Sequence, residues 1–436
     1  MAYSVKKLVL AIIACFCMFL PRRVEILNIY SYRVFIILGA FIGFSLVRYK
    51  IRLFSPITSL AYLLYISFYC LRYIAESEIV GMLGFVVETL VLMALFGTML
   101  ESKRDLDYWI TLFMRALLVY CFLCLVETFT GFSIWSLFGA SKTFMRYGLY
   151  RSYGAFSTSI NNGVFLMLCF PIVYYYKVYI CDDTFCKIVH VFVWLALCST
   201  LSRAPLLAAL LLNIIWVWKN GLAKFLRQHA LHLLLSIGIL IVLCNYGPLK
   251  SIFQSYINMF VAIINPEVAQ SIGTSFGSNA NGVGHRFSLV SWVFDALNKE
   301  HAFIFGVGPV KEFNYAFVTS QGSTHFKQSI ENHYLSQLYR YGIVGLALHS
   351  AFLIRCLFST KKGINLELRN HEKLCVSNTF QFRLLSTFFC YYLVLFTVGA
   401  VDDYRMFLLL VVISEIWKKV DCAVPECVHC RNQRLE

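Results

Sequence analysis

Long apolar runs separated by short polar segments recur along the whole chain. A helix needs roughly 20 apolar residues to cross the hydrocarbon core of a bilayer, and about twelve runs approach this length. These runs are residues 7–21, 28–47, 57–74, 79–99, 108–130, 161–179, 186–201, 204–218, 230–247, 341–358, 383–400 and 404–418. Because 7–21, 186–201 and 204–218 are short, a count of about ten or eleven also fits. The pattern predicts an all-α polytopic membrane protein that forms a single integral membrane domain over residues 1–436.

Two longer polar segments, 131–160 and 247–340, interrupt this pattern. The second begins with the apolar stretch SIFQSYINMFVAII, which is followed by a run rich in Gly, Ser and Asn. The stretch HRFSLVSWVFDALNKE then has the spacing of an amphipathic helix, and FIFGVGP predicts a tight apolar turn. Loops longer than about 15 residues are usually functional or disordered. We expect 247–340 to be a large, partly helical outer loop that folds over the membrane surface and contains the active site, with 131–160 as the first outer loop.

Composition supports a membrane protein and explains the positive charge. The chain is 59% hydrophobic and 14% charged, with a mean hydropathy of +0.69. A soluble domain is nearer half apolar and a quarter charged. A net charge of +15 would favour nucleic-acid binding in a soluble protein, but cytoplasmic loops of membrane proteins accumulate Lys and Arg. If both termini are cytoplasmic, most basic residues fall on the cytoplasmic side. We therefore expect a multi-pass protein with cytoplasmic termini and no nucleic-acid partner.

The sixteen cysteines agree with this topology. All of them fall in predicted spans or cytoplasmic segments, and neither long outer loop contains one. A disulfide framework is therefore not expected, and most cysteines should act as small apolar packing residues. The C-terminal segment CAVPECVHC holds Cys422, Cys427, His429 and Cys430, a set that could bind zinc. Because His429 and Cys430 are adjacent, this spacing is poor for a metal site, and we expect neither a metal nor a cofactor.

Two arginines are candidates for binding an anion. Arg203 lies in TLSRAPLL between two apolar runs, where a charge is costly and indicates function; the alternative is a side chain that reaches out to lipid headgroups. Arg286 follows a glycine-rich turn and lies near the start of a predicted helix, where its charge opposes the helix dipole. A bound anion would relieve this conflict through the guanidinium and the free backbone N–H groups. The alternative for Arg286 is a solvated loop residue.

Other charged and aromatic residues lie in or near the first outer loop. Arg146 and Arg151 flank YGLYRSYGAF, whose tyrosines would either stack on sugar rings or belong to the aromatic belt of the membrane interface. Glu127, in ETFTG, is expected to face a cavity near the outer side. Glu88 and Arg115 lie at comparable depth in adjacent spans, which predicts a structural ion pair between them.

The stretch ENHYLSQLYRYGIVGL carries a polar group where the large loop meets an apolar run. A helix cap requires one polar residue, whereas Glu331, Asn332 and His333 stand together. A histidine suits a general base near neutral pH without tuning, and a glutamate would need burial. Together with the two arginines, these residues predict metal-independent attack on a lipid diphosphate, with electrostatic stabilisation of the leaving group. Asp402 and Asp403 are reserve candidates for the acid or base.

The order of these pieces resembles the O-antigen polymerase and O-antigen ligase superfamily of bacterial inner-membrane glycosyltransferases. The resemblance covers residues 120–350 and rests on ETFTG, RSYGAFSTSINNG, TLSRAPL, HRFSLVSWVFDAL, FGVGP and ENHYLSQLYRYGIVGL. It implies a GT-C-like fold of about twelve helices with a large periplasmic loop. It also implies an undecaprenyl-diphosphate-linked oligosaccharide as substrate, the lipid bilayer and a chain-length regulator protein as partners, and diphosphate handling by Arg203 and Arg286. Further substrate-binding residues would be Arg151, Asn332 and Tyr334.

One position distinguishes the two branches of the superfamily. Ligases typically carry His-Asn or His-Ser eleven residues before the first Gly of a G-x-x-G helix. Counting back from Gly342 gives Glu331, so ENHYL resembles the acidic-Asn-x-Tyr-Leu of polymerases, although a small shift of register would restore His333. We favour an inverting polymerase that makes O-antigen, capsule or exopolysaccharide, with Glu331 or His333 as base. The alternatives are a ligase acting on lipid A-core and a flippase or other transporter, although transporters place their sites at the bilayer midplane.

Overall fold

The computed structural model describes most of the chain. The described residues are 2–20, 25–26, 29–46, 60–138, 145–146, 149–180, 183–219, 282–311, 313, 315–318, 324–327, 330, 332–370, 379–396 and 404–421. The predicted run 230–247, the apolar stretch at 251–264 and the cysteine-rich tail lie outside these residues.

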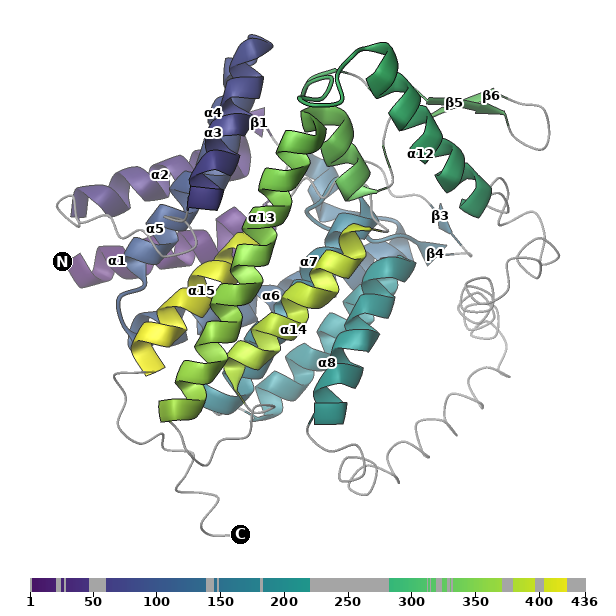
Figure 1. Ribbon diagram of the computed structural model, residues 1–436. Helices are drawn as coiled ribbons and strands as arrows, with labels where there is room; N and C mark the ends of the chain where they lie inside the picture. The colour runs from purple at the N-terminus through teal and green to yellow at the C-terminus, as the bar shows by residue number, and fades with distance from the viewer. Residues whose placement is uncertain are drawn as a thin grey trace, which may run out of the picture.

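Helices make up most of the described chain, and the majority pack side by side in one bundle (Figure 1). They are α1 (Ala2–Ile12) with η1 (Ile13–Cys17), α2 (Ser31–Leu46), α3 (Leu60–Ala75), α4 (Ile79–Val86) with η2 (Val87–Val91) and α5 (Leu92–Met99), α6 (Lys103–Thr130), η3 (Ile134–Phe138), α7 (Ser159–Tyr175) with η4 (Tyr176–Ile180), α8 (Asp183–Ser199), a helix at 203–219, α12 (Gly282–Lys299), α13 (His333–Asn370), α14 (Phe380–Leu395) and α15 (Arg405–Asp421). Each predicted run other than 230–247 overlaps one of these helices, which confirms an all-α polytopic membrane protein.

Strands are confined to three short antiparallel hairpins in the described residues. These are β1 (Glu25–Ile26) with β2 (Ile29–Tyr30), β3 (Met145–Arg146) with β4 (Leu149–Tyr150), and β5 (Tyr315–Val318) with β6 (Thr324–Lys327). Each hairpin lies in a connection between two helices. The described strands therefore form no separate sheet layer in the helical bundle.

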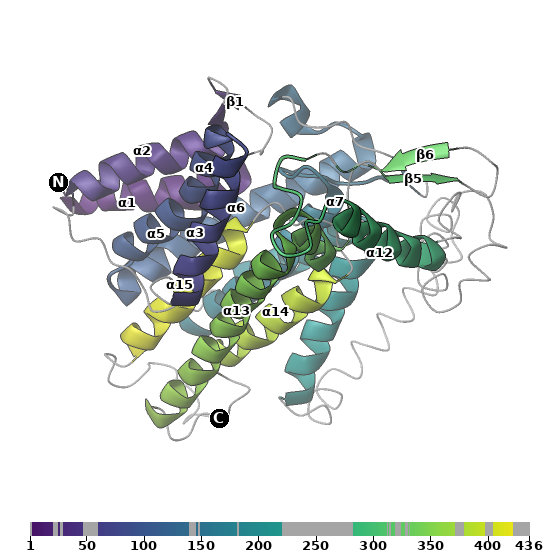
Figure 2. The same ribbon diagram turned by 45° about the horizontal axis from the view of Figure 1, so that its top comes forward.

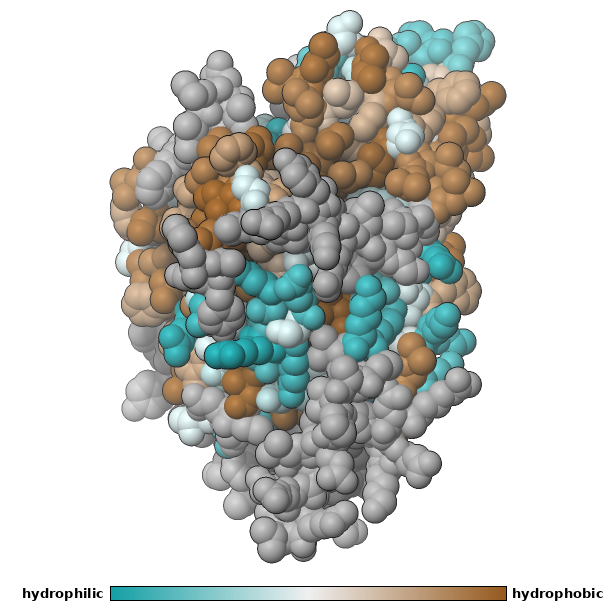
Figure 3. Space-filling model, turned by 90° about the vertical axis from the view of Figure 1, so that its left-hand side faces the viewer, coloured by the Kyte–Doolittle hydropathy of each residue, from teal (hydrophilic) through white to brown (hydrophobic). Residues whose placement is uncertain are grey.

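Apolar surface and helix length fit a bilayer environment. Within the described ranges, four helical stretches are long and apolar enough to cross a membrane, and they are Ile79–Met99, Lys103–Thr130, Ser159–Ile180 and His333–Leu368. Large hydrophobic side chains are exposed along α2, α3 and α4, including Phe41, Leu60 and Val80. The space-filling view shows broad hydrophobic areas on one side of the molecule (Figure 3). Exposed apolar areas of this size would be unfavourable in water, and they fit contact with the lipid chains of a bilayer.

Local sequence sets the limits of α6. The Ser102 hydroxyl accepts a hydrogen bond from the Asp105 backbone N–H (3.3 Å), and the Asp105 carboxylate accepts one from the Ser102 N–H (3.1 Å). This reciprocal capping box satisfies N–H groups that have no partner inside the helix. At the other end, Gly131 adopts a left-handed conformation (φ 71°) and donates to the Glu127 carbonyl, which stops the helix.

Glu88 pairs with Arg33 rather than with Arg115. The Glu88 carboxylate lies 2.6 Å from the Arg33 Nη2 atom and 2.7 Å from its Nε, and it also accepts a hydrogen bond from the Tyr32 hydroxyl. Arg115 is exposed on α6. The predicted Glu88–Arg115 pair is therefore wrong, because comparable depth in the membrane does not determine which helix faces meet.

A break at Gly342 folds α13 into a helical hairpin. Gly342 has φ 68° and ψ −170°, outside the helical range. The Nε2 atoms of His333 and His349 are 3.3 Å apart although the residues are sixteen positions apart, a separation of about 24 Å along a straight helix. A short arm (333–341) therefore runs back beside a long arm (343–370). His349 comes seven positions after Gly342 and His333 comes nine positions before it, so the two histidines lie about 10–14 Å from the hairpin tip along the helix axes.

The predicted amphipathic helix and apolar turn cover the hairpin tip. In α12, Leu289, Val293 and Leu297 share a small apolar core with residues of the short arm, and Figure 2 shows α12 beside the end of α13. The Ile343 N–H donates to the Phe303 carbonyl at 3.0 Å, which attaches the FIFGVGP turn to the hairpin. The helix and the turn expected within the large loop are both confirmed. This end of the bundle is called the hairpin end below.

Replacing Gly342 with Ala should destabilise the hairpin strongly. A Cβ atom there would overlap the Ile304 carbonyl, and the positive φ disfavours any residue with a side chain. Such strain costs about 1–3 kcal/mol before the overlap is counted. We expect a lower melting temperature for Gly342→Ala than for the control Gly39→Ala, whose Cβ would meet only a Leu95 methyl group at 3.2 Å. Equal melting temperatures for the two purified variants would contradict the hairpin.

Candidate functional site

The first candidate site is an arginine turn, formed by Arg151 and residues 199–203. The Arg151 Nη2 atom donates to the Ser202 hydroxyl at 3.1 Å, and its Nε donates to the Thr200 carbonyl at 3.4 Å. Arg203 is the next residue and begins the helix at 203–219. The Ser202 hydroxyl also lies 3.3 Å from the Ser159 hydroxyl, in the first turn of α7. The turn thus combines two arginines with two helix N-termini, an arrangement that favours a bound anion.

The arginine turn lies at the hairpin end of the bundle. Tyr175, at the end of α7, packs edge-on against Phe380, at the start of α14, with ring centroids 5.0 Å apart. The two helices are therefore antiparallel, so the first residues of α7 lie at the same end as the last residues of α14. The Asn332 side-chain amide donates to the Phe396 carbonyl at that end (3.0 Å). Polar residues of the first loop and of the α13 region consequently share one end of the molecule.

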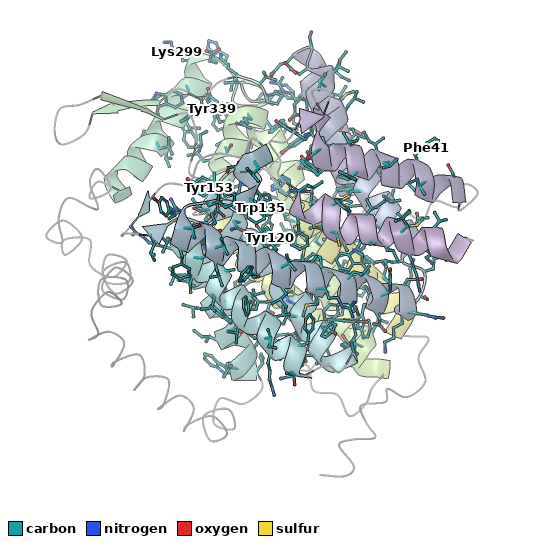
Figure 4. All side chains as sticks on the ribbon, turned by 180° about the vertical axis from the view of Figure 1, so that it is seen from behind. Phe41, Tyr120, Trp135, Tyr153, Lys299 and Tyr339 are labelled. Carbon is teal, nitrogen blue, oxygen red and sulfur yellow. The ribbon has the colours of Figure 1, made fainter. Side chains whose placement is uncertain are left out.

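Glu127 is enclosed near the arginine turn. Its side chain is 0% exposed and accepts hydrogen bonds from the Ser152 hydroxyl (2.9 Å) and the Gly154 N–H (3.0 Å). Tyr120, Trp135 and Tyr153 lie close together in the same region (Figure 4). The expectation that Glu127 faces a cavity is corrected, because the loop after β4 folds over the carboxylate and seals it.

The second candidate site is a buried histidine cluster at the base of the hairpin. His333 is 1% exposed, and its Nε2 atom lies 3.3 Å from His349 Nε2, 3.2 Å from Gln337 Nε2 and 2.8 Å from the Tyr404 hydroxyl. The Tyr69 hydroxyl of α3 donates to Oε1 of Gln337. The cluster therefore joins four parts of the chain, namely α3, both arms of α13 and the start of α15.

Hydrogen-bond donors converge on the Nε2 atom of His333. Because the Gln337 Oε1 atom accepts from Tyr69, its Nε2 atom is left to donate toward His333. In the tautomer that fits this arrangement, the Nε2 atom of His333 carries its single lone pair toward these partners. The hydroxyl of Tyr404 is its nearest partner, at 2.8 Å, and Tyr404 is only half-buried. Tyr404 is therefore the residue of this pair whose side chain is partly exposed and can contact a bound substrate.

Asn332 and Tyr334 hold the start of α13 in place. The Asn332 side-chain oxygen accepts from the Leu335 N–H at 3.0 Å, which is the bond of a helix N-cap. The hydroxyl of Tyr334 donates to the Tyr392 carbonyl at 3.3 Å, and its ring packs against Phe396 at 4.4 Å. Both residues contact α14 or its end, and their role in substrate binding stays a prediction.

Several predicted residues fall partly or wholly outside the described chain. Glu331, Asp402 and Asp403 lie outside it; Glu331 directly precedes Asn332, and Asp403 directly precedes Tyr404. Arg286 lies in α12, as expected, but only its backbone is described, and the same holds for Arg146 in β3. The structure thus brings Arg151 and Arg203 together and gives no contact for Arg286.

Sequence reasoning missed His349 and Tyr404. A signal for His349 was present, since it is an ionisable residue inside the apolar run GLALHSAFLI, and such residues are rare and often functional. Tyr404 follows the two reserve aspartates, but no local pattern links it to His333. Only the hairpin at Gly342 and the packing of α15 bring these side chains together.

Comparison with known proteins finds a match to one family model over part of the chain. A family model described as O-antigen ligase matches residues 188–350. The matched segment runs from within α8 to the long arm of α13, and it includes Arg203, α12 and His333. The match confirms the resemblance to the O-antigen polymerase and ligase superfamily. No curated protein matches the chain.

Proposed function

We propose that this chain, whose residues 188–350 match a family model described as O-antigen ligase, is a polymerase. It would join undecaprenyl-diphosphate-linked oligosaccharide repeats into O-antigen, capsule or exopolysaccharide at the periplasmic face of the inner membrane. The family match supports glycosyl transfer, and ENHYL at residues 331–335, which resembles the polymerase pattern, favours a polymerase over a ligase. The position of Arg151 and Arg203 beside two helix N-termini supports the proposal, since a lipid diphosphate needs cations at a membrane surface.

In the proposed reaction, a hydroxyl oxygen of the acceptor repeat attacks the anomeric carbon of the donor chain. The new C–O bond forms as the C–O bond to the diphosphate breaks, which inverts the anomeric centre. The leaving diphosphate takes the electron pair, and the guanidinium groups of Arg151, Arg203 and Arg286 stabilise its charge without requiring a metal ion. The acceptor hydroxyl must lose its proton to a base.

We assign this base to Glu331 or to His333 acting through Tyr404. The His333 Nε2 atom is enclosed, and the Tyr404 hydroxyl is its nearest hydrogen-bond partner. As the substrate hydroxyl gives its proton to the Tyr404 oxygen, Tyr404 would pass its own proton to His333. Asn332 caps the helix that carries His333 and would keep the imidazole in place.

A ligase is the second candidate, because the matching family model is described by that activity. Both enzymes would use the same donor and differ in the acceptor. Cells that lack the chain distinguish them through their lipid-linked intermediates. Loss of a polymerase leaves single repeats on undecaprenyl diphosphate, whereas loss of a ligase leaves long polymers on the same carrier. Accumulation of single repeats supports the proposal, and accumulation of polymer assigns the chain as a ligase.

The proposed topology places α12 in the periplasm and the far end of α13 in the cytoplasm. Asn298 is exposed on α12, and Lys361 is exposed near the other end of α13. We expect Asn298→Cys to react with a membrane-impermeant maleimide in intact spheroplasts, and Lys361→Cys to react only after lysis. The reverse pattern would place the loop in the cytoplasm and remove the proposed active site from the periplasm.

A further inference from the structure

Glu127 is a fully buried carboxylate in the last turn of α6. Its Oε2 atom accepts two hydrogen bonds, from the Ser152 hydroxyl and the Gly154 N–H, but its Oε1 atom is buried and has no hydrogen-bond partner. Burying a carboxylate with an unsatisfied oxygen is costly compared with an apolar or amide side chain. A simple packing role would not need a carboxyl group, so the residue requires another explanation.

The bonds of Glu127 converge on the loop that follows β4. The Ser152 N–H donates to the Ser199 carbonyl at 3.1 Å, so Ser152 is tied both to α6 and to the end of α8. Gly154 has φ 53°, and a Cβ there would overlap the Tyr120 hydroxyl. That hydroxyl accepts from the Ala155 N–H at 3.3 Å. The backbone from 152 to 155 is therefore fixed on the side chains of α6.

Arg151 directly precedes this fixed segment. Its guanidinium reaches the Thr200 carbonyl and the Ser202 hydroxyl, so two anchors, one on each side, determine where it lies. The anchor at Glu127 consists of two hydrogen bonds, from the Ser152 hydroxyl and the Gly154 N–H. Weakening that anchor would free the loop backbone and let the guanidinium move away from Arg203.

We propose that Glu127 is a positioning residue that holds Arg151 in the arginine turn, and thereby sets the affinity of the site for the lipid diphosphate. This inference rests on the proposed function. Glu127 itself is sealed from substrate and acts only through the Ser152–Gly154 backbone. Displacing a binding group by about 1 Å can cost on the order of 100-fold in rate, so the expected effect is large for a residue that never touches substrate.

The test measures KM for a lipid-linked donor and kcat with purified Glu127→Gln and Ser152→Ala. Both variants remove part of the anchor while keeping side-chain size nearly constant. We expect KM to rise and kcat to fall in Glu127→Gln, so that kcat/KM drops about 10- to 100-fold, with a smaller drop in Ser152→Ala. The control is Glu367→Gln, a buried carboxylate at the opposite end of the bundle that also accepts backbone N–H groups, from Phe380 and Gln381. Its KM should stay at the wild-type value.

A double-mutant cycle separates positioning from a general effect on folding. If Glu127 acts through Arg151, its loss should matter little once Arg151 is gone. Glu127→Gln should therefore change KM less than about twofold in an Arg151→Ala background, a non-additive result in the double-mutant cycle. Additive effects would overturn the inference, as would wild-type KM in Glu127→Gln. Wild-type kinetics in Arg151→Ala alone would instead remove Arg151 from the proposed active site. The two failures are therefore distinguishable.

Discussion

Replacing Arg203 or Arg151 with Ala should abolish polymer in cells and lower kcat/KM of the purified protein by about 100- to 1,000-fold, the usual effect of removing one group that stabilises transition-state charge. Both residues belong to the arginine turn, where Arg151 is bonded to Thr200 and Ser202. Lys at either position should restore activity only in part, because it keeps the charge but loses the planar fork that binds two phosphate oxygens.

The matched control for these variants is Arg115→Ala, which removes an exposed arginine of α6. This variant should make polymer of normal length. Membrane abundance of all variants should be compared by immunoblot, so that loss of protein is not mistaken for loss of activity. Normal polymer from Arg203→Ala and Arg151→Ala, at normal abundance, would remove the arginine turn from the proposed active site.

Removing the hydroxyl of Tyr404 should slow elongation by about 100- to 10,000-fold, the range of general acid–base contributions. The Tyr404 hydroxyl is the nearest hydrogen-bond partner of His333 Nε2, at 2.8 Å. Tyr404→Phe keeps the ring and removes the proton path. Because both residues would act on one proton, His333→Ala in the Tyr404→Phe background should cause little further loss.

A tyrosine elsewhere in the bundle provides the comparison. Tyr62→Phe removes a buried hydroxyl that donates to the Thr89 carbonyl at 3.0 Å, and it should leave the elongation rate near the wild-type value. If Tyr404→Phe elongates lipid-linked repeats as fast as Tyr62→Phe, proton transfer through the histidine cluster is contradicted. Glu331 would then be the base to test next.

The helices were predictable because their signals are local. Apolar runs of membrane length and the 3.6-residue period of α12 depend only on neighbouring residues, and glycines with positive φ explain the FIFGVGP turn. The family resemblance, carried by short motifs in a fixed order, was confirmed in the segment 188–350. These features need no knowledge of which helices pack together.

The contacts between helices, including those within the candidate site, were not predictable in the same way. Arg33 and Glu88 are 55 positions apart in the chain, and only the packing of α2 on η2 selects this pair over Arg115. The glycine at 342 signals a break, but the sequence does not reveal that the chain reverses there. Without that reversal, His333 and His349 would be far apart, and Tyr404 would have no link to either.

The most direct test of the proposed function is elongation by the purified protein alone. The protein would be placed in liposomes with a single oligosaccharide repeat on undecaprenyl diphosphate, and the lipid products would be measured by mass spectrometry. A polymerase should give carriers that bear two, three and more repeats, with one free undecaprenyl diphosphate released per bond formed. Unchanged single-repeat lipid, with transfer only after lipid A-core is added, would contradict a polymerase and identify a ligase.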